Sequence, residues 1–291
     1  MRFSFAESMC DPDQYVPLAL AVERCGYTSF TIPDSICYPE TSDSKYPYTP
    51  DGNREFLDGR PFIDPFVLIA TLGAVTETLR FTTFVVKLPI RQPVLVAKQA
   101  MSVAVMTQNR FGFGVGLSPW PEDFEVCEQP WKARGKRMDE MIEILRGLET
   151  GGFFGYDGDH FHLRRIKMSP APAERIPILI GGHADAALRR AARIGDGWMH
   201  AGGDGDELQT MIDRVQALRR EYGREKEPFE IHVISMDGFT LDGVKRLEDR
   251  GVTDVIVGFR DAYQPDTMTL DQKIAALEGF ANNVIAKNRT S

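Results

Sequence analysis

The chain has 291 residues, 43% of them hydrophobic, and a formal net charge of −8 at pH 7. That content can bury a large core, and the acidic balance argues against nucleic acid as a partner. No run of about 18 apolar residues and no N-terminal apolar signal region are present, so we expect no membrane-spanning segment and no export.

Strand-like and helix-like segments alternate along the chain. The predicted strands are residues 3–6, 28–33, 80–87, 110–116, 176–180, 197–201, 229–236 and 254–259. The predicted helices are residues 11–26, 64–76, 93–106, 132–150, the segment after the fifth strand, 206–222, 241–250 and 270–288. A doubly wound open sheet more often stops at five to seven strands. Eight strands that alternate with eight helices, without a strong linker between them, therefore predict a single (β/α)8 TIM barrel domain over residues 1–291.

Three segments interrupt the alternation. Residues 35–62, after strand two, and 117–131, after strand four, lack periodicity, and residues 151–163 resemble a hairpin before strand five. A connection as long as 35–62 is typical of a functional lid, so we expect it to cover the carboxyl ends of the strands. Aromatic side chains of these loops are candidates to line a substrate pocket, and they include Tyr38, Tyr46, Tyr48 and Trp120.

The four cysteines show no pattern typical of metal binding. They are Cys10, Cys25, Cys37 and Cys127, and they form neither a C-x-x-C pair nor another metal-ligand spacing. We therefore expect reduced thiols, no metal site and a cytoplasmic protein.

The segment 177–198 is the most informative part of the chain. A short apolar strand ends in Gly181 and Gly182 and turns directly into a helix, so the first N–H groups of the helix point at whatever lies above the strand. Glycine also lets a ligand approach the backbone closely. This turn predicts a phosphate site, although glycine ends strands for steric reasons as well.

Several motifs in this order resemble the bacterial luciferase-like family of flavin and deazaflavin oxidoreductases over nearly the whole chain. They are Gly26-Tyr27 before Pro33-Asp34, Leu88-Pro89-Ile90-Arg91-Gln92-Pro93 before Ala97-Lys98-Gln99, the segment 109–116, Arg137-x-Asp139-Glu140, the segment 177–182 and Gly195-Asp196-Gly197-Trp198.

The resemblance implies a TIM barrel that holds FMN or the deazaflavin coenzyme F420 in its mouth. It implies a non-proline cis peptide between Phe84 and Val85 that supports the ring system, although this pair also reads as ordinary strand core. The implied phosphate site is formed by Gly182, His183 and Ala184 and lies near Ala201, Gly202 and Gly203, and Gly181 is a further implied cofactor-binding residue.

The resemblance also places an acidic residue, Asp34, near the coenzyme ring or the substrate. Asp34 and the neighbouring Ser35 are the predicted catalytic residues, and Ser118 is predicted to hydrogen-bond the coenzyme ring. An aspartate after a strand also caps loops, so a structural role for Asp34 stays open.

The chain departs from some deazaflavin-dependent sugar dehydrogenases of the family. These place a histidine where Ser35 stands and a glutamate where Leu117 follows Gly116. A sugar-phosphate mechanism that relies on that pair is therefore not supported.

The function predicted from these features is F420-dependent hydride transfer to or from a small organic substrate, apolar or ring-containing, by a homodimer. The alternatives are an FMN-dependent monooxygenase that needs a flavin reductase, and a non-catalytic flavin-binding barrel. Because the cofactor carries the chemistry, the protein's task in the first two cases is orientation and exclusion of water.

Overall fold

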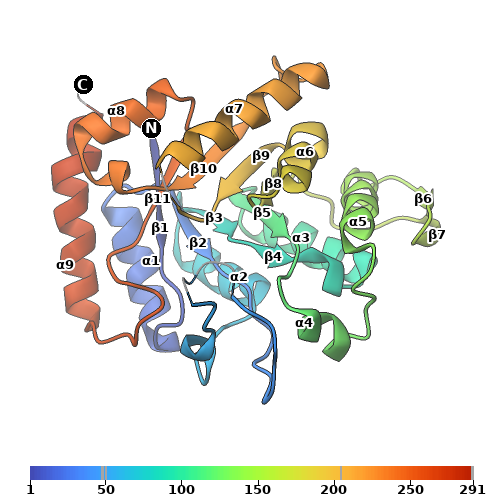
Figure 1. Cartoon of the computed structure of the whole chain (residues 1–291), viewed down its shortest axis with the longest axis horizontal. Coiled ribbons are helices and arrows are strands. Elements are labelled where there is room, and N and C mark those ends of the chain that lie inside the picture. The colour runs from blue at the N-terminus through green and yellow to red at the C-terminus, as the bar shows by residue number, and fades with distance from the viewer. Residues whose placement is uncertain (47–48, 50, 204, 290–291) are drawn as a thin grey trace.

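The computed structural model describes residues 1–46, 49, 51–203 and 205–289. Its centre is a closed parallel barrel, as predicted (Figure 1). The strands are β1 (Arg2–Ala6), β2 (Ser29–Ile32), β3 (Arg80–Thr83), β5 (Phe111–Gly116), β8 (Ile178–Gly181), β9 (Gly197–His200), β10 (Glu230–Ile234) and β11 (Asp254–Val257). They pair in the order β3-β2-β1-β11-β10-β9-β8-β5, and the pairing of β3 with β5 closes the ring.

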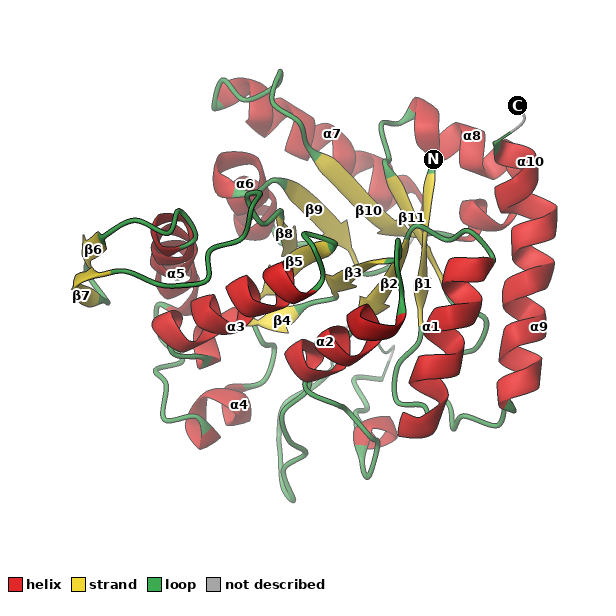
Figure 2. Ribbon diagram, turned by 180° about the vertical axis from the view of Figure 1, so that it is seen from behind, coloured by secondary structure: helices red, strands yellow, loops and turns green. Residues whose placement is uncertain are grey.

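Helices surround the barrel, because each strand is buried and each returning helix packs an apolar face on it (Figure 2). They are α1 (Tyr15–Arg24), α2 (Pro65–Val75), α3 (Pro93–Met106), α5 (Arg134–Leu148), α6 (Asp185–Ile194), α7 (Gly205–Glu221), α8 (Leu241–Asp249) and α9 (Leu270–Phe280). The predicted hairpin is present as β6 (Phe154–Asp157) and β7 (His162–Ile166), at the periphery outside α5.

The structure corrects three details of the predicted elements. The segment 117–131, predicted to be irregular, contains the short helix α4 (Pro121–Val126), which a proline at its first position and two acidic residues in its first turn favour. The predicted third strand is divided into β3 and β4 (Val86–Lys87), and β4 pairs with β5. The last helix contains a π-turn, Ala281–Ile285, before α10 (Ala286–Asn288).

Candidate active site at the barrel mouth

An apolar wall stands at the mouth where β3 passes into β4. The peptide bond between Phe84 and Val85 is cis, as predicted. Both side chains are half-buried and pack on a small interior cluster formed by Leu179, Met199 and Ile256. This pair therefore presents accessible apolar surface toward the mouth, while its other side rests on the barrel core.

Two glycines leave room for the Val85 side chain of this wall. A Cβ atom on Gly116, the last residue of β5, or on Gly181, the last residue of β8, would lie 2.8 Å from a methyl group of Val85. Real Cβ atoms essentially never come so close to another heavy atom. Glycine at the ends of two neighbouring strands thus gives Val85 its place over them.

The turn after β8 leads into α6 without a capping side chain. Gly182 has a φ of +125°, a backbone conformation that L residues rarely adopt. Ala184 occupies the N-cap of α6 and has no side-chain oxygen to accept from the first turn. The N–H groups at the start of α6 therefore suit an external anion, and the indole of Trp198 anchors the turn by donating to the carbonyl of Gly182 at 2.9 Å.

The turn after β9 lies against the turn after β8 through two imidazoles. The N–H of Ala201 donates to Nε2 of His183 at 3.0 Å, and the N–H of Gly202 donates to Nδ1 of His200 at 3.2 Å. The two rings are stacked with centroids 4.5 Å apart. Burial lowers the pKa of His183, and burial together with His183 lowers the pKa of His200 to about 4.

Asp34, predicted to be catalytic, lies buried beyond the end of β2, and both of its carboxylate oxygens have partners. Its Oδ2 accepts from the backbone N–H of Lys87 at 2.9 Å, and both oxygens contact the guanidinium of Arg91 at 2.9 Å. Asp34 thereby joins the end of β2 to the end of β4. Ser35, beside it, is half-buried. The catalytic roles of Asp34 and Ser35 stay predictions.

Ser118, predicted to contact the coenzyme ring, is buried in the turn between β5 and α4. Its hydroxyl donates to Oδ2 of Asp123 at 2.5 Å and accepts from the N–H of Trp120 at 3.0 Å. The same Asp123 oxygen lies 2.7 Å from the ammonium of Lys87. In this conformation Ser118 organises the α4 segment, and its contact with a coenzyme stays a prediction.

The described part of the segment 35–62 lies over the mouth, in contact with the loops after β5 and β11. The guanidinium of Arg54 stands 4.1 Å from the ring centroid of Trp120 and 3.7 Å from the carboxylate of Glu122. Tyr46 stacks on Trp120 with centroids 5.5 Å apart and contacts Tyr263 edge-on at 5.8 Å. Loops far apart in the sequence thus form one aromatic cluster, whereas Tyr48 lies outside the described residues.

A second ionic network closes the side of the mouth between β1 and β11. Glu7, directly after β1, lies 2.7 Å from the guanidinium of Arg260 and 3.4 Å from the ammonium of Lys273. That ammonium also lies 2.5 Å from Asp266. This network was not predicted from the sequence, although Glu7, like Asp34, is a carboxylate that follows a barrel strand.

The structure thus gathers most of the predicted site residues. The wall and the two turns bring together Phe84, Val85, Gly181, Gly182, His183, Ala184, Ala201 and Gly202. Asp34 and Ser118 lie near Lys87 instead, in buried ionic contacts. The signal for Lys87 was a charged side chain between the apolar residues Val86 and Leu88.

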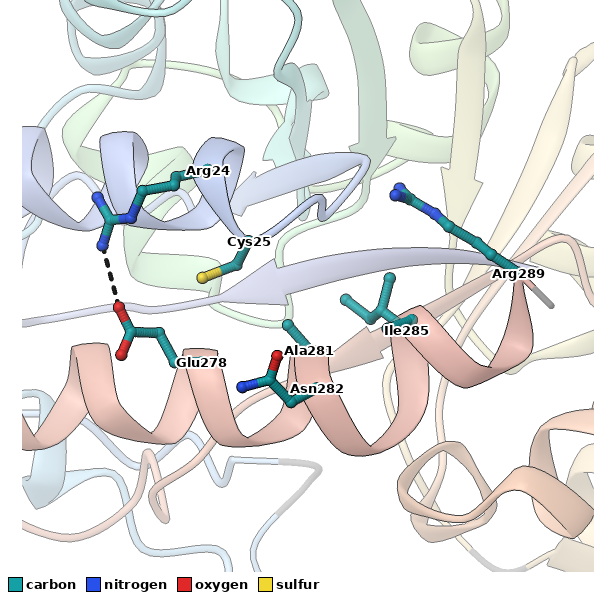
Figure 3. A pocket seen from close by; sticks show the side chains of 8 residues that line it. Arg24, Cys25, Glu278, Ala281, Asn282, Ile285 and Arg289 are labelled. Carbon is teal, nitrogen blue, oxygen red and sulfur yellow. Dashed lines mark hydrogen bonds and ion pairs between the residues drawn. The ribbon is translucent and has the colours of Figure 1, made fainter.

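A separate depression of about 330 Å³ lies outside the barrel, between the end of α1 and the π-turn after α9 (Figure 3). Arg24 and Glu278 form an ion pair across it at 3.2 Å, and Arg289 lies at its other end. Because α1 ends at the amino-terminal face of the barrel, this depression is remote from the mouth.

Within the described ranges, no group of three or more His, Cys, Asp or Glu side chains is arranged to hold a metal ion. In the same part of the chain, no helix combines the length and the apolar character needed to cross a membrane.

Comparison with known families decides what kind of barrel this is. A family model described as luciferase-like monooxygenase matches residues 5–236. The chain belongs to this family. An uncharacterized protein of Mycobacterium tuberculosis (strain ATCC 25618 / H37Rv) is 65% identical over 289 residues, which cover 99% of this chain and 100% of that protein. The same barrel occurs in solved structures of a monooxygenase and of an F420-dependent reductase.

The monooxygenase RslO1 from Streptomyces bottropensis superposes with a TM-score of 0.79 at 16% identity, covering 99% of both chains. The coenzyme F420 dependent tetrahydromethanopterin reductase from Methanopyrus kandleri superposes with a TM-score of 0.75 at 13% identity, covering 98% of this chain and 99% of that one. At these identities the two structures show a shared fold.

Proposed function

We propose that this luciferase-like protein is an F420-dependent oxidoreductase that transfers a hydride to or from a small organic substrate. The observation that carries the proposal is the pairing of an accessible apolar wall with an uncapped helix N-terminus. Phe84 and Val85 form the wall, and the turn at Gly182 lies next to it, since Gly181 packs under Val85. A coenzyme with a planar ring and a phosphate tail needs both features, side by side.

The residues of the mouth fit such a group. A side chain at position 182 would meet Ala187 with its Cβ at 3.0 Å, so the glycine keeps the backbone of the turn accessible. The bound deazaflavin supplies the hydride chemistry. Phe84 and Val85 support the face of its ring, the start of α6 binds its phosphate, and the aromatic cluster of Tyr46 and Trp120 excludes water.

The substrate that fits this mouth is apolar or contains a ring. The aromatic cluster over the mouth takes side chains from three loops, and its charged neighbours are already paired, as Arg54 is with Glu122 and Lys87 with Asp123. Aromatic faces bind planar apolar groups by stacking and by area burial. Asp34 acts as a positioning residue in this proposal, since it holds the backbone at the end of β4.

The alternative function is an FMN-dependent monooxygenase that receives reduced flavin from a reductase. The likeness to RslO1 over the full length of both chains favours it, since that protein is a monooxygenase. A third candidate is a barrel that binds a flavin without catalysis.

Titration of the purified protein with F420 and with FMN, followed by fluorescence quenching of each coenzyme, separates the two enzymatic functions. We expect F420 to bind at least tenfold more tightly than FMN. Tighter binding of FMN would favour the monooxygenase. FMN reduced by a flavin reductase should then support oxygenation of a substrate by this protein. Failure of both coenzymes to bind would reject the two enzymatic proposals.

We further propose that the protein is a homodimer that buries the outer faces of α2 and α3. α2 contains no charged residue, and a helix that is apolar on all sides normally lies inside a protein. Yet Val67 on α2 is 60% exposed, and Leu95 at the start of the neighbouring α3 is 66% exposed. Val75 and Met106 extend this apolar face to the other ends of the two helices.

Leu95→Glu is expected to convert the dimer to a monomer, because burial of two symmetry-related carboxylates in an apolar interface costs several kcal/mol. Sedimentation equilibrium measures the mass. Phe153→Glu is the matched control, since Phe153 is equally exposed, at 66%, on the peripheral hairpin. A parent protein that is monomeric, or a Leu95→Glu variant that remains dimeric, would contradict this interface.

The proposed location is the cytoplasm. All four cysteines are free thiols, and free thiols persist in reducing compartments.

A further inference from the structure

The turns after β8 and β9, which contain the phosphate contacts predicted from the sequence, are held together by acceptors that belong to the protein. His183 accepts from the N–H of Ala201, and His200 accepts from the N–H of Gly202. Two backbone donors at the mouth are therefore already used by imidazole nitrogens. The N-cap residue of α6, beside them, is Ala184, so no side chain caps the N–H groups at the start of this helix.

The contact with Ala201 defines the state of the His183 ring. A nitrogen that accepts carries no proton, so the neutral ring holds its proton on Nδ1. Protonation at Nε2 would turn that acceptor into a donor and release the N–H of Ala201. The turn would gain two donors and one positive charge in a single step.

Only one of the two stacked rings can take this charge near neutral pH. The pKa of His200 is lowered to about 4 by burial and by the neighbouring His183, so His200 stays neutral. Burial lowers the pKa of His183 as well, but the carboxylate of Glu207 on α7 acts in the opposite direction. One protonated ring beside a neutral one avoids the repulsion of two stacked imidazolium ions.

Asp185, two residues after His183, is already paired with other side chains. Asp185 in the first turn of α6 is exposed and lies 2.6 Å from Arg189 and 2.7 Å from Arg214. These two arginines lower the pKa of Asp185, so its charge is already balanced. Asp204 lies outside the described residues.

We propose that binding of a phosphate-like dianion between the turns after β8 and β9 is coupled to uptake of one proton by His183. The dianion stabilises the protonated ring of His183. Protonation in turn offers the dianion two more donors, the ring Nε2–H and the released N–H of Ala201, so the proton and the dianion each strengthen binding of the other. This inference rests on the proposed function only for the identity of the anion, the phosphate end of the coenzyme.

The coupling fixes the direction of the pH dependence. In the free protein His183 has a pKa below its usual value near 6.5, and the bound dianion raises it. Affinity for the anion therefore increases as the pH falls from 8, and it levels off below the pKa of the free protein. Between the two pKa values the dissociation constant changes up to about tenfold for each pH unit.

Sulfate is the probe, because it remains a dianion between pH 5.5 and 8 and adds no titration of its own. We expect its dissociation constant, measured by isothermal titration calorimetry, to be at least tenfold lower at pH 6 than at pH 8. Titrations at pH 7 in buffers of different ionisation enthalpy should show net proton uptake. The Cε1–H resonance of His183 should titrate at a higher pH with sulfate than without it.

His183→Gln keeps a side-chain acceptor for Ala201 but cannot titrate, so its sulfate affinity should not vary with pH. His162→Gln is the matched control, since His162 lies exposed on the hairpin, and it should retain the pH dependence of the parent. An unchanged resonance of His183, equal affinity at pH 6 and 8 in the parent, or an equally steep dependence in His183→Gln would overturn the coupling.

Binding of F420 and FMN at pH 8 tests the proposed function separately. Coenzyme binding together with a flat sulfate profile would reject the coupling and leave the function standing. A coupled sulfate profile without coenzyme binding would reject the function and leave an anion site of another kind.

Discussion

Asp34→Asn is expected to destabilise the protein by about 3 kcal/mol, because removing one partner of a buried ion pair leaves the other charge uncompensated. The Asp34 side chain is 1% exposed, and both of its oxygens contact Arg91. The substitution also weakens the acceptor for the N–H of Lys87. Urea denaturation measures the effect as a lower midpoint at an unchanged slope.

Asp157→Asn is the control for this substitution. Asp157 is also paired, at 2.6 Å with His162, but its side chain is 92% exposed on the hairpin. Exposed pairs contribute little, so its midpoint should equal that of the parent. Equal midpoints for Asp34→Asn and the parent would show that Asp34 is not a structural anchor, and would strengthen its predicted catalytic role.

Gly182→Val is expected to weaken binding of the coenzyme at least tenfold, which corresponds to about 1.4 kcal/mol. The branched side chain would cover the backbone that a phosphate approaches, and its Cβ would lie 3.0 Å from that of Ala187. The measurement is the dissociation constant of whichever coenzyme binds the parent, F420 or FMN.

The control separates loss of the site from loss of the fold. Gly182 has a φ of +125°, so valine there is strained as well as bulky. Gly251, before β11, has a φ of +87°, and a Cβ atom added to it would have open space around it, with no neighbour within 4 Å. Gly251→Val should therefore lose stability but keep coenzyme affinity. A Gly182→Val variant that folds and binds like the parent would remove the phosphate site from this turn.

Local signals in the sequence were sufficient for most elements. The apolar segment 93–106, with Pro93 at its start, predicted α3 with the observed bounds. α4 was missed because six residues are too few for helical periodicity to stand out from a loop. Residues 281–285 continued a helical pattern, which does not distinguish a π-turn from an α-helix.

For the candidate site, the sequence by itself determined the positions where strands end in glycine or in a charged residue, and hence the turn at Gly182 and the place of Asp34. Only the tertiary structure decided their partners. Arg91 is 57 residues from Asp34, and Arg260 is 253 residues from Glu7. Closing the barrel brings such strand ends together, and burial then forces each charge to find a partner, which no local pattern specifies.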